Sequence, residues 1–276
     1  MHYQHRYHAG NFADVFKHSL LCGLLSALNR KETPWFFLDT HAGAGLYDLK
    51  DEAAGRTAEH EGGIARLRQT ENVPAMVQGY LCLAAAQNAE RPGHYPGSPL
   101  LARALARDSD RLALCEQVPA VAEQLKVAVG RDTRVAIHLR DGYEGHALLP
   151  PAQKRGLIFV DPPFERRDEF DAMSEFLKKS LARFAHGVYA LWYPIKNQHE
   201  AKRFLRRSSL LERPALSLGL ETGAEAEGQM RGCGLLVVNP PFGFEEQARE
   251  ALAFLALHLA QGPKPAWSVT PLSAGG

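Results

Sequence analysis

Short apolar runs that end in polar residues or glycine alternate along the chain with stretches of helical spacing. This alternation predicts an α/β domain with a largely parallel sheet. We predict seven strands, at residues 35–39, 112–116, 135–139, 157–161, 188–192, 216–220 and 235–239. We predict helices near residues 14–29, 98–106, 121–129, 170–184 and 244–259.

One interval between the predicted strands is too long for a compact nucleotide-binding unit. The first strand ends at Asp39 and the next at Glu116, whereas such a unit places its acidic residue about 20 residues after the glycine turn. Residues 46–97 contain further stretches of helical spacing, so we predict a small inserted helical subdomain there. Residues 1–45 and 98–276 would then form the main domain. The tail from Gly262, rich in proline and glycine, is expected to be extended or mobile.

Composition narrows the class of protein. The chain has 276 residues, of which 45% are hydrophobic and 23% charged, which suits one large α/β domain with a core of its own. The formal net charge of +1 excludes the strongly basic class of proteins that coat nucleic acid nonspecifically. Any contact with nucleic acid must therefore come from a local patch.

Cysteine usage and hydropathy indicate a soluble cytoplasmic protein. Cys22, Cys82, Cys115 and Cys233 are scattered, without a CxxC pair, among apolar neighbours, as expected for reduced core residues. No stretch approaches the roughly 18 uncharged apolar residues of a membrane span. The amino-terminal histidines could form a metal site, but acidic or cysteine companions are missing there. We therefore favour the interpretation that these histidines are hydrogen-bond donors that face a cofactor or a nucleic acid.

The ends of three predicted strands suit a nucleotide-like cofactor. The first strand opens into the glycine-containing turn 39–45, where backbone amides can approach a ligand closely. Glu116 ends the second strand, where a carboxylate can accept hydrogen bonds from both ribose hydroxyls. Asp141 ends the third strand and could accept from an adenine amino group, while Gly142 leaves room for the ring. Each strand end alone is a weak signal, but the three together indicate a cofactor site.

The most specific motif is Asp161-Pro162-Pro163-Phe164, which follows a hydrophobic strand. It resembles the catalytic motif of amino-directed methyltransferases. An exocyclic amino group is a poor nucleophile, and the Asp161 carboxylate with the Pro162 carbonyl could accept both of its hydrogens. The prolines restrict φ and hold these acceptors in place. Phe164 offers a face for an unstacked base, a contact worth about 1–3 kcal/mol.

A second copy of the motif, Asn239-Pro240-Pro241-Phe242, could be read as catalytic in the same way. We favour Asp161 because it directly follows the three cofactor strands, whereas Asn239 follows two further strands.

Positive charge gathers between Lys196 and Arg207 and at Arg166-Arg167, which predicts a rim that binds phosphates beside the motif. Lys17 and His18, on the first predicted helix, could reach a cofactor carboxylate or form a pair on the helix surface.

Over essentially its whole length the chain resembles the bacterial ribosomal RNA large subunit methyltransferase J family. The resemblance rests on these segments: His8-Ala9-Gly10-Asn11, Ala13-Asp14-Val15, Lys17-His18, residues 38–45, Tyr95-Pro96-Gly97-Ser98-Pro99, Asp161-Pro162-Pro163, residues 189–194 and Asn239-Pro240-Pro241. Phe164 stands where relatives often have tyrosine, which keeps the stacking face and removes a hydroxyl.

The resemblance implies a class I S-adenosylmethionine-dependent methyltransferase fold, Rossmann-like, with a seven-stranded, mostly parallel sheet. It implies that the methyl group goes to N6 of a specific adenine in 23S rRNA, naked or partly assembled, with no obligate protein partner and no membrane. The residues that it implies for cofactor binding are His18, His41, Ser98, Glu116, Asp141 and Gly142. It makes Asp161 the catalytic residue, brings Tyr3 to the substrate together with Pro162 and Phe164, and includes no metal. A monomer is expected.

Two other functions remain open from the sequence. The Asp-Pro-Pro-Phe chemistry does not distinguish RNA from DNA, or adenine from cytosine, so a DNA amino methyltransferase would carry the same motif. A fold never guarantees catalysis, so the chain could also be a binding module for nucleotides or RNA. Within the methyltransferase interpretation, we expect the inserted segment 46–97 to dock RNA rather than to support the core.

Overall fold

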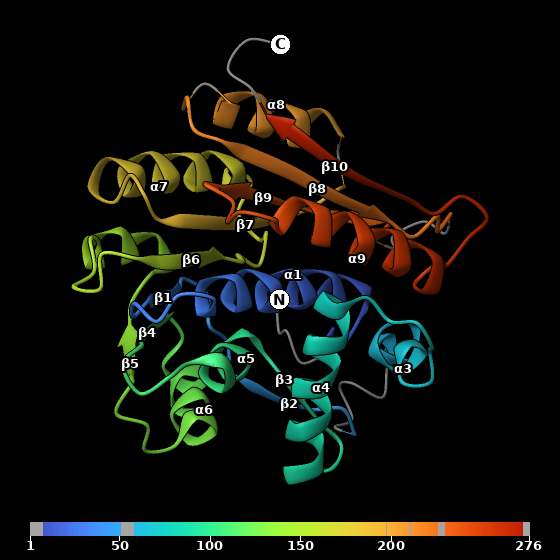
Figure 1. The fold of residues 1–276 in the computed structure, drawn as a ribbon, viewed down its shortest axis with the longest axis horizontal. Helices are drawn as coiled ribbons and strands as arrows, with labels where there is room; N and C mark the ends of the chain where they lie inside the picture. Colours follow the sequence, from blue (N-terminus) through green and yellow to red (C-terminus); the bar gives the residue numbers. More distant parts are fainter. Residues whose placement is uncertain (1–7, 51–57, 197, 210, 226–229, 273–276) are drawn as a thin grey trace.

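A twisted eight-stranded sheet forms the centre of the protein, as the computed structural model shows for residues 8–50, 58–196, 198–209, 211–225 and 230–272 (Figure 1). In spatial order its strands are β10 (Ala266–Leu272), β8 (Ala215–Glu221), β9 (Gly232–Val238), β7 (Val188–Pro194), β6 (Gly156–Val160), β1 (Phe36–Asp39), β4 (Arg111–Glu116) and β5 (Val135–Leu139). The strands from β7 to β5 run parallel, whereas β9 is antiparallel to β7 and β8, and β10 is antiparallel to β8. This mixed sheet confirms the predicted α/β class.

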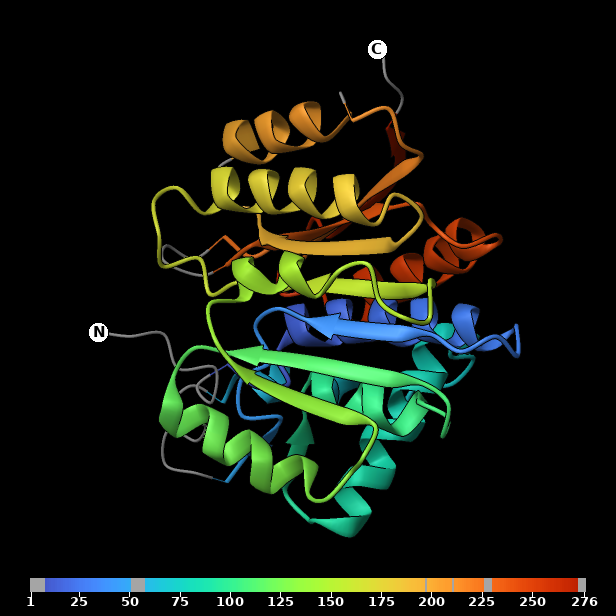
Figure 2. The same cartoon turned by 90° about the vertical axis from the view of Figure 1, so that its left-hand side faces the viewer.

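Helices cover both faces of the sheet (Figure 2). They are α1 (Phe12–Asn29), α4 (Ala75–Glu90), α5 (Ser98–Leu105), α6 (Pro119–Val129), α7 (Glu169–Arg183), α8 (Gln198–Ser209) and α9 (Phe244–His258), with the short turns η2 (Glu59–Gly62), α3 (Ile64–Leu67) and η3 (Gly142–Leu148). Alternate residues of β1 face two different hydrophobic cores. Phe37 belongs to the core that contains α1, α4, α5 and α9, and Leu38 belongs to the core that contains α7 and α8. None of the helices in these ranges is long and apolar enough to cross a bilayer.

Helix α1 is buried on almost every side because it packs between the sheet and the helices α4, α5 and α9. It begins after Asn11, whose side chain accepts a hydrogen bond from the Asp14 amide at 2.9 Å. Of its residues only Ser26 is exposed. Lys17 and His18 are buried, so they do not form a pair on the helix surface.

The tail from Gly262 adds an eighth strand to the predicted seven. β10 pairs with β8 along its whole length and forms the edge of the sheet. The alternation of apolar and polar residues is weak in β10 because only Val269 of this strand is buried. Pro271 is tolerated because an edge strand can lose one backbone hydrogen-bond donor. The helix α8 and the small sheet of β2 (Leu46–Asp48) and β3 (His94–Pro96) were likewise not predicted.

The inserted segment supports the core, so the expectation that it only docks RNA is wrong. Its residues Met76, Val77, Tyr80 and Tyr95 are buried in the same hydrophobic core as α1. Helix α4 packs against α1 at Gly23, where an added Cβ would lie 2.6 Å from the Met76 side chain. Removing this segment would expose the core. The division into domains 1–45 with 98–276 and 46–97 stays a prediction.

The cysteines differ from one another in exposure. Cys22, Cys115 and Cys233 are buried, as expected of core residues, and burial raises the pKa of each of these thiols. Cys82 is exposed on α4, so its prediction as a core residue is wrong, because the apolar neighbours in its sequence lie on other faces of the helix.

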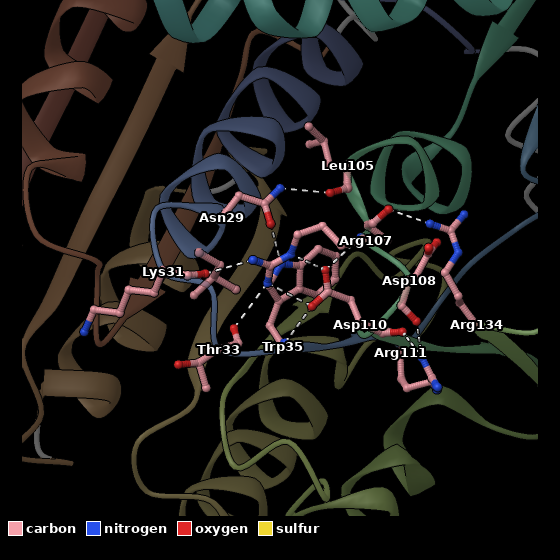
Figure 3. A network of polar contacts seen from close by, with 12 residues as sticks. Asn29, Lys31, Thr33, Trp35, Leu105, Arg107, Asp108, Asp110, Arg111 and Arg134 are labelled. Carbon is pink, nitrogen blue, oxygen red and sulfur yellow. Dashed lines mark hydrogen bonds and ion pairs between the residues drawn. The ribbon is translucent and has the colours of Figure 1, made fainter.

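A buried carboxylate joins the amino-terminal ends of two central strands (Figure 3). Asp110, which is fully buried, accepts hydrogen bonds from the Trp35 amide at 2.8 Å and from the Arg107 guanidinium at 2.9 and 3.0 Å. The Trp35 indole donates to Asn29 at 2.8 Å, and Asn29 donates to the Leu105 carbonyl at 2.8 Å. The network therefore holds α1, α5, β1 and β4 together at the end of the sheet away from the glycine turn.

We predict that Asp110→Ala lowers the free energy of unfolding by about 2–4 kcal/mol, because it removes the buried carboxylate that pairs with the half-buried Arg107 and leaves the Trp35 amide without its acceptor. Chemical denaturation measures the change. Asp108→Ala, at an exposed neighbour, is the control and should change stability by less than about 0.5 kcal/mol. Equal losses in both variants would show that the network does not support the fold.

Asp110 should also make the stability of the protein depend on pH. Burial alone would raise the pKa of Asp110, but hydrogen bonds from Arg107 and from the Trp35 amide lower it overall. Its contribution to stability is therefore present above the unfolded-state pKa of about 4 and is lost as the pH falls through the lower folded-state value. The wild type and Asp110→Ala should accordingly converge in stability at acid pH.

Candidate active site

A cleft of about 1840 Å³ lies over the carboxyl ends of the parallel strands. It is larger than the roughly 300–1,000 Å³ of a typical small-molecule pocket. Residues that follow β1, β4, β5 and β6 line it, together with the first part of α1. The order of the strands reverses direction between β1 and β6, which is where open α/β sheets bind their ligands.

The turn after β1 is built around a buried carboxylate. Asp39 accepts hydrogen bonds from the Ser98 hydroxyl at 2.6 Å and from the His41 amide at 3.2 Å. Burial, with the nearby charge of Asp161, raises the pKa of Asp39 to about 7. Gly43 has a φ of +63°, and a Cβ there would lie 2.4 Å from the Tyr47 hydroxyl, so the turn requires glycine at this position.

The ends of β4 and β5 converge on this turn. The Glu116 carboxylate accepts hydrogen bonds from the amides of Gly43 at 3.1 Å and Val118 at 2.8 Å, which hold it at the cleft. Asp141 caps η3 by accepting from the Tyr143 amide at 2.9 Å. A Cβ on Gly142 would lie 1.8 Å from the Thr40 carbonyl oxygen, so only glycine fits there. The structure thus brings together the three strand ends that the sequence singled out.

His18 and His41 both line the cleft. His18 is buried in α1, and its Nδ1 lies 2.7 Å from the Tyr95 hydroxyl. His41 lies with its Nδ1 2.8 Å from the Thr40 hydroxyl and packs edge-on against the Tyr143 ring. Burial lowers the pKa of His41 to about 4, so its imidazole is neutral at physiological pH.

Asp161 is part of a buried charge cluster. Its carboxylate lies 2.7 Å from the Lys17 ammonium, which lies 2.8 Å from the carboxylate of Asp14. The exposed fractions of these side chains are 14% for Asp161, 6% for Lys17 and 2% for Asp14. Lys17 also lies 5.5 Å from the centre of the Trp192 ring. Lys17 therefore contacts the carboxylate of the Asp-Pro-Pro motif, a partner that its place in the sequence did not reveal.

Phe164 lies at the cleft in a strained conformation. Its φ is +52°, a left-handed value that costs a bulky residue of the order of 1–3 kcal/mol. Its ring is met edge-on by Phe170 at 5.1 Å and by Trp192 at 6.0 Å. Pro162 lines the cleft beside it. Strain of this kind gathers at functional sites, because the turn must direct its side chains to the ligand.

The second Pro-Pro-Phe motif lies at the opposite edge of the sheet. β9 is antiparallel to β7, so Val238 pairs with Tyr189 near the start of β7. Asn239, which follows Val238, is therefore far from the carboxyl ends where Asp161 lies. This strand direction supports the preference for Asp161 more strongly than the order of the strands does.

The positively charged run divides between two places. Lys196 lines the cleft, as do Arg66 and Arg231, which the sequence did not single out. Helix α8 packs against α7 instead, where Arg203 and Arg207 pair with an α7 carboxylate. None of the described α8 residues lines the cleft.

The amino-terminal residues are described only in part. Tyr3 lies outside the described residues. His8 lines the cleft and pairs with Glu59 of η2 at 2.9 Å, a contact that raises the pKa of His8. Within the described ranges, no group of three or more His, Cys, Asp or Glu side chains could hold a metal ion.

Comparisons with known proteins agree with this geometry. The family described as "Ribosomal RNA large subunit methyltransferase D, RlmJ" matches residues 32–271. Two curated relatives carry the name "Ribosomal RNA large subunit methyltransferase J". That of Escherichia coli is 38% identical over 92% of both chains, and that of Haemophilus influenzae is 34% identical over 97% of both. The crystal structure of a Legionella pneumophila protein, 35% identical, covers 96% of this chain and 99% of its own, with a TM-score of 0.89.

We predict that Asn239 is structural. Its side-chain amide donates to the carbonyls of Ala185 at 3.0 Å and Gly187 at 2.8 Å. Asn239→Ala should lower the free energy of unfolding by about 1–3 kcal/mol more than Asn72→Ala, because two hydrogen bonds are lost. Asn72 has the same φ of +54° but is exposed, so it controls for backbone strain. Equal losses in urea denaturation would contradict the assignment.

Proposed function

Because this chain belongs to the ribosomal RNA large subunit methyltransferase J family, and is thus an S-adenosylmethionine-dependent rRNA methyltransferase, we propose that it methylates the exocyclic N6 of a specific adenine in 23S rRNA. Asp161 is the catalytic residue of this proposal. The observation that carries it is the place of the Asp161 carboxylate, in one cleft with the ends of the three cofactor strands and with Pro162 and Phe164.

The cleft fits S-adenosylmethionine. The Glu116 carboxylate is held at the cleft and would bind both ribose hydroxyls, and Gly142, which lines the cleft, would lie beside the adenine ring. Asp141 would accept from the adenine amino group. His18, His41 and Ser98, next to the turn after β1, would hold the methionine end. When bound there, the cofactor supplies an electrophilic methyl group on a sulfonium.

Asp161 and Pro162 prepare the adenine nitrogen for attack. The Asp161 carboxylate and the Pro162 carbonyl would accept the two amino hydrogens, which directs the nitrogen lone pair toward the methyl group. The Asp161 carboxylate would stabilise the positive charge that methyl transfer places on N6, and Asp161 or water would take the departing proton.

Lys17 and Phe164 support this arrangement. The buried Lys17 ammonium forms a charge-assisted contact with Asp161 and holds the carboxylate in one orientation. Phe164, kept in place by the rings of Phe170 and Trp192, would offer its face to the flipped base. Tyr3, outside the described residues, remains a proposed substrate contact from the resemblance.

The RNA backbone would be held by the cations of the cleft wall. Arg66 donates to the Ala260 carbonyl, and Arg231 donates to that of Glu225 at 2.9 Å, which positions both side chains. Among the described residues neither these arginines nor Lys196 is paired with a carboxylate. They surround a cleft that is larger than the cofactor site needs. We propose naked or partly assembled 23S rRNA as the partner, a monomeric enzyme, and the cytoplasm as its location, since its substrate class is found there.

We predict that Asp161→Ala lowers the single-turnover rate on 23S rRNA about 10²–10³-fold while the affinity for S-adenosylmethionine changes little, because a preorganised acceptor is lost at the reacting nitrogen. The comparison variant is Asn239→Ala, whose rate per folded molecule should stay near that of the wild type. A folded Asp161→Ala enzyme with normal rate would refute the assignment. Wild-type methylation of duplex DNA but not of 23S rRNA would refute the substrate.

We predict that replacing Arg66, Lys196 and Arg231 together by glutamine weakens RNA binding and makes it less dependent on salt. Each lost phosphate contact should reduce the slope of log affinity against log salt concentration by about 0.7–0.9. The control is the triple glutamine variant of Lys202, Arg203 and Arg206 on α8, which should keep the wild-type slope. A reduced slope in the control alone would place the RNA on α8 instead. Filter binding at several salt concentrations measures both.

A further inference from the structure

Irregular backbone connects the Asp-Pro-Pro-Phe motif to helix α7. Residues 161–168 form neither helix nor strand, and the last four of them are exposed. These four, residues 165–168, which we call the motif loop, lie between Phe164, which lines the cleft, and Glu169, the first residue of α7. A segment outside helices and strands keeps one conformation where side chains fix it. The contacts of the residues at its ends therefore decide how firmly the motif loop is held.

Glu169 provides such a contact at the far end of the motif loop. It is only 3% exposed, and its carboxylate accepts a hydrogen bond from the Tyr143 hydroxyl at 2.6 Å. The Arg166 amide donates to the same carboxylate at 3.4 Å. Burial raises the pKa of Tyr143 well above its ordinary value, so its hydroxyl stays protonated and remains a donor. A buried carboxylate without a donor is costly, so this bond fixes the start of α7 against Tyr143.

Tyr143 is itself fixed at the side of the cleft where we propose the cofactor. Its amide donates to the Asp141 carboxylate at 2.9 Å, and its ring meets that of His41 edge-on at a centroid distance of 5.1 Å. The guanidinium of Arg166 lies 6.0 Å from the centre of the Tyr143 ring, which is a cation–π contact. One side chain of η3 therefore contacts both Arg166, inside the motif loop, and Glu169, at its end.

The strained turn at Phe164 depends on such support. A bulky residue with a φ of +52° keeps this conformation only where the surrounding structure over-determines it. The rings of Phe170 and Trp192 pack against the Phe164 ring. Phe170 directly follows Glu169, so the bond to Tyr143 also fixes one of these two rings. Loss of that bond would release the motif loop and part of the packing around Phe164 together.

We propose that Tyr143 and Glu169 are positioning residues, whose hydrogen bond holds the motif loop and the turn of Phe164 in the orientation that receives the flipped base. This inference rests on the proposed stacking of the base on Phe164. Neither Tyr143 nor Glu169 is among the described residues that line the cleft, so both act through Phe164. A base that meets a ring already in place spends less binding free energy on ordering the protein.

Tyr143→Phe tests the proposal because it removes the hydroxyl and keeps the ring beside His41. We expect kcat/KM for 23S rRNA to fall about tenfold, as for the loss of one hydrogen bond to a charged group. The Kd for S-adenosylmethionine should stay near that of the wild type. Tyr189→Phe is the matched control, because its fully buried hydroxyl donates to the Phe184 carbonyl at 2.7 Å near the start of β7. This control should lose stability and keep the wild-type kcat/KM.

Cleavage by trypsin measures how firmly the motif loop is held, without any substrate. Arg166 and Arg167 are exposed within this loop, and cleavage after either residue requires local opening. Cleavage there should be about tenfold faster in Tyr143→Phe, because it follows the population of the open loop, and unchanged in Tyr189→Phe. Mass spectrometry identifies the fragments. An unchanged rate at these arginines in Tyr143→Phe would show that the bond does not hold the loop, and the proposal would fail.

A double variant separates positioning from stability. Tyr143→Phe leaves the Glu169 carboxylate buried without this donor, whereas Tyr143→Phe combined with Glu169→Met replaces both partners by apolar groups and should recover most of the lost stability. Its kcat/KM for 23S rRNA should nevertheless stay low, because no directional bond holds the loop. Recovery of kcat/KM together with stability would show that the pair only supports the fold, and would overturn the proposal.

Phe164→Leu distinguishes this inference from the proposed function. If a folded Phe164→Leu protein keeps the wild-type kcat/KM, the proposed stacking on Phe164 is wrong. If Phe164→Leu lowers kcat/KM but Tyr143→Phe does not, the stacking holds and the positioning role of Tyr143 and Glu169 is wrong. Because trypsin needs no RNA, faster cleavage in Tyr143→Phe supports the hold on the loop even if the substrate is not 23S rRNA.

Discussion

The contact between Lys17 and Asp161 joins helix α1 to the end of β6, and the arrangement of the cleft depends on it. A charged lysine that is only 6% exposed is costly unless it is paired, and here two carboxylates surround it. This requirement places the first turns of α1 beside the carboxyl ends of the strands. The same turns carry His18 into the cleft, so the buried Lys17 ammonium connects the carboxylate that we propose as catalytic to the proposed cofactor side of the site.

The two ends of the sheet have different tasks. At the amino-terminal ends of β1 and β4, Asp110 satisfies a backbone amide and an arginine, and the side chains drawn in Figure 3 close a hydrogen-bonded network. The carboxyl ends contain several features that lower stability. These are glycine turns, the left-handed backbone of Phe164 and the buried carboxylate of Asp39. The network around Asp110 holds the amino-terminal ends of the strands in register, so the protein can tolerate these destabilising features at their carboxyl ends.

The inserted segment belongs to both the core and the site. Its helix α4 covers α1, which would otherwise expose the apolar face opposite the sheet, and its tyrosines reach His18. A segment that buries its own side chains against the main domain contributes to one cooperative unit. The cations of the cleft wall come from this segment, from the end of β7 and from the residues before β9, so three parts of the chain that are distant in sequence face the proposed RNA.

The sequence by itself determined the fold class, the strand ends at Asp39, Glu116, Asp141 and Asp161, and the position of the Asp-Pro-Pro-Phe turn directly after a buried strand. These features are local, because strand periodicity and turn residues are read within a few positions. Only the tertiary structure decided that Asn239 lies at the opposite edge, since the direction of β9 is set by its pairing with β7. It also decided the partners of Lys17 and His18, because Asp161 and Tyr95 meet them through chain packing that no local spacing encodes. The edge strand β10 was not predicted for a related reason. It has only one buried residue, so its sequence shows little alternation of apolar and polar positions, and its pairing with β8 makes it a strand.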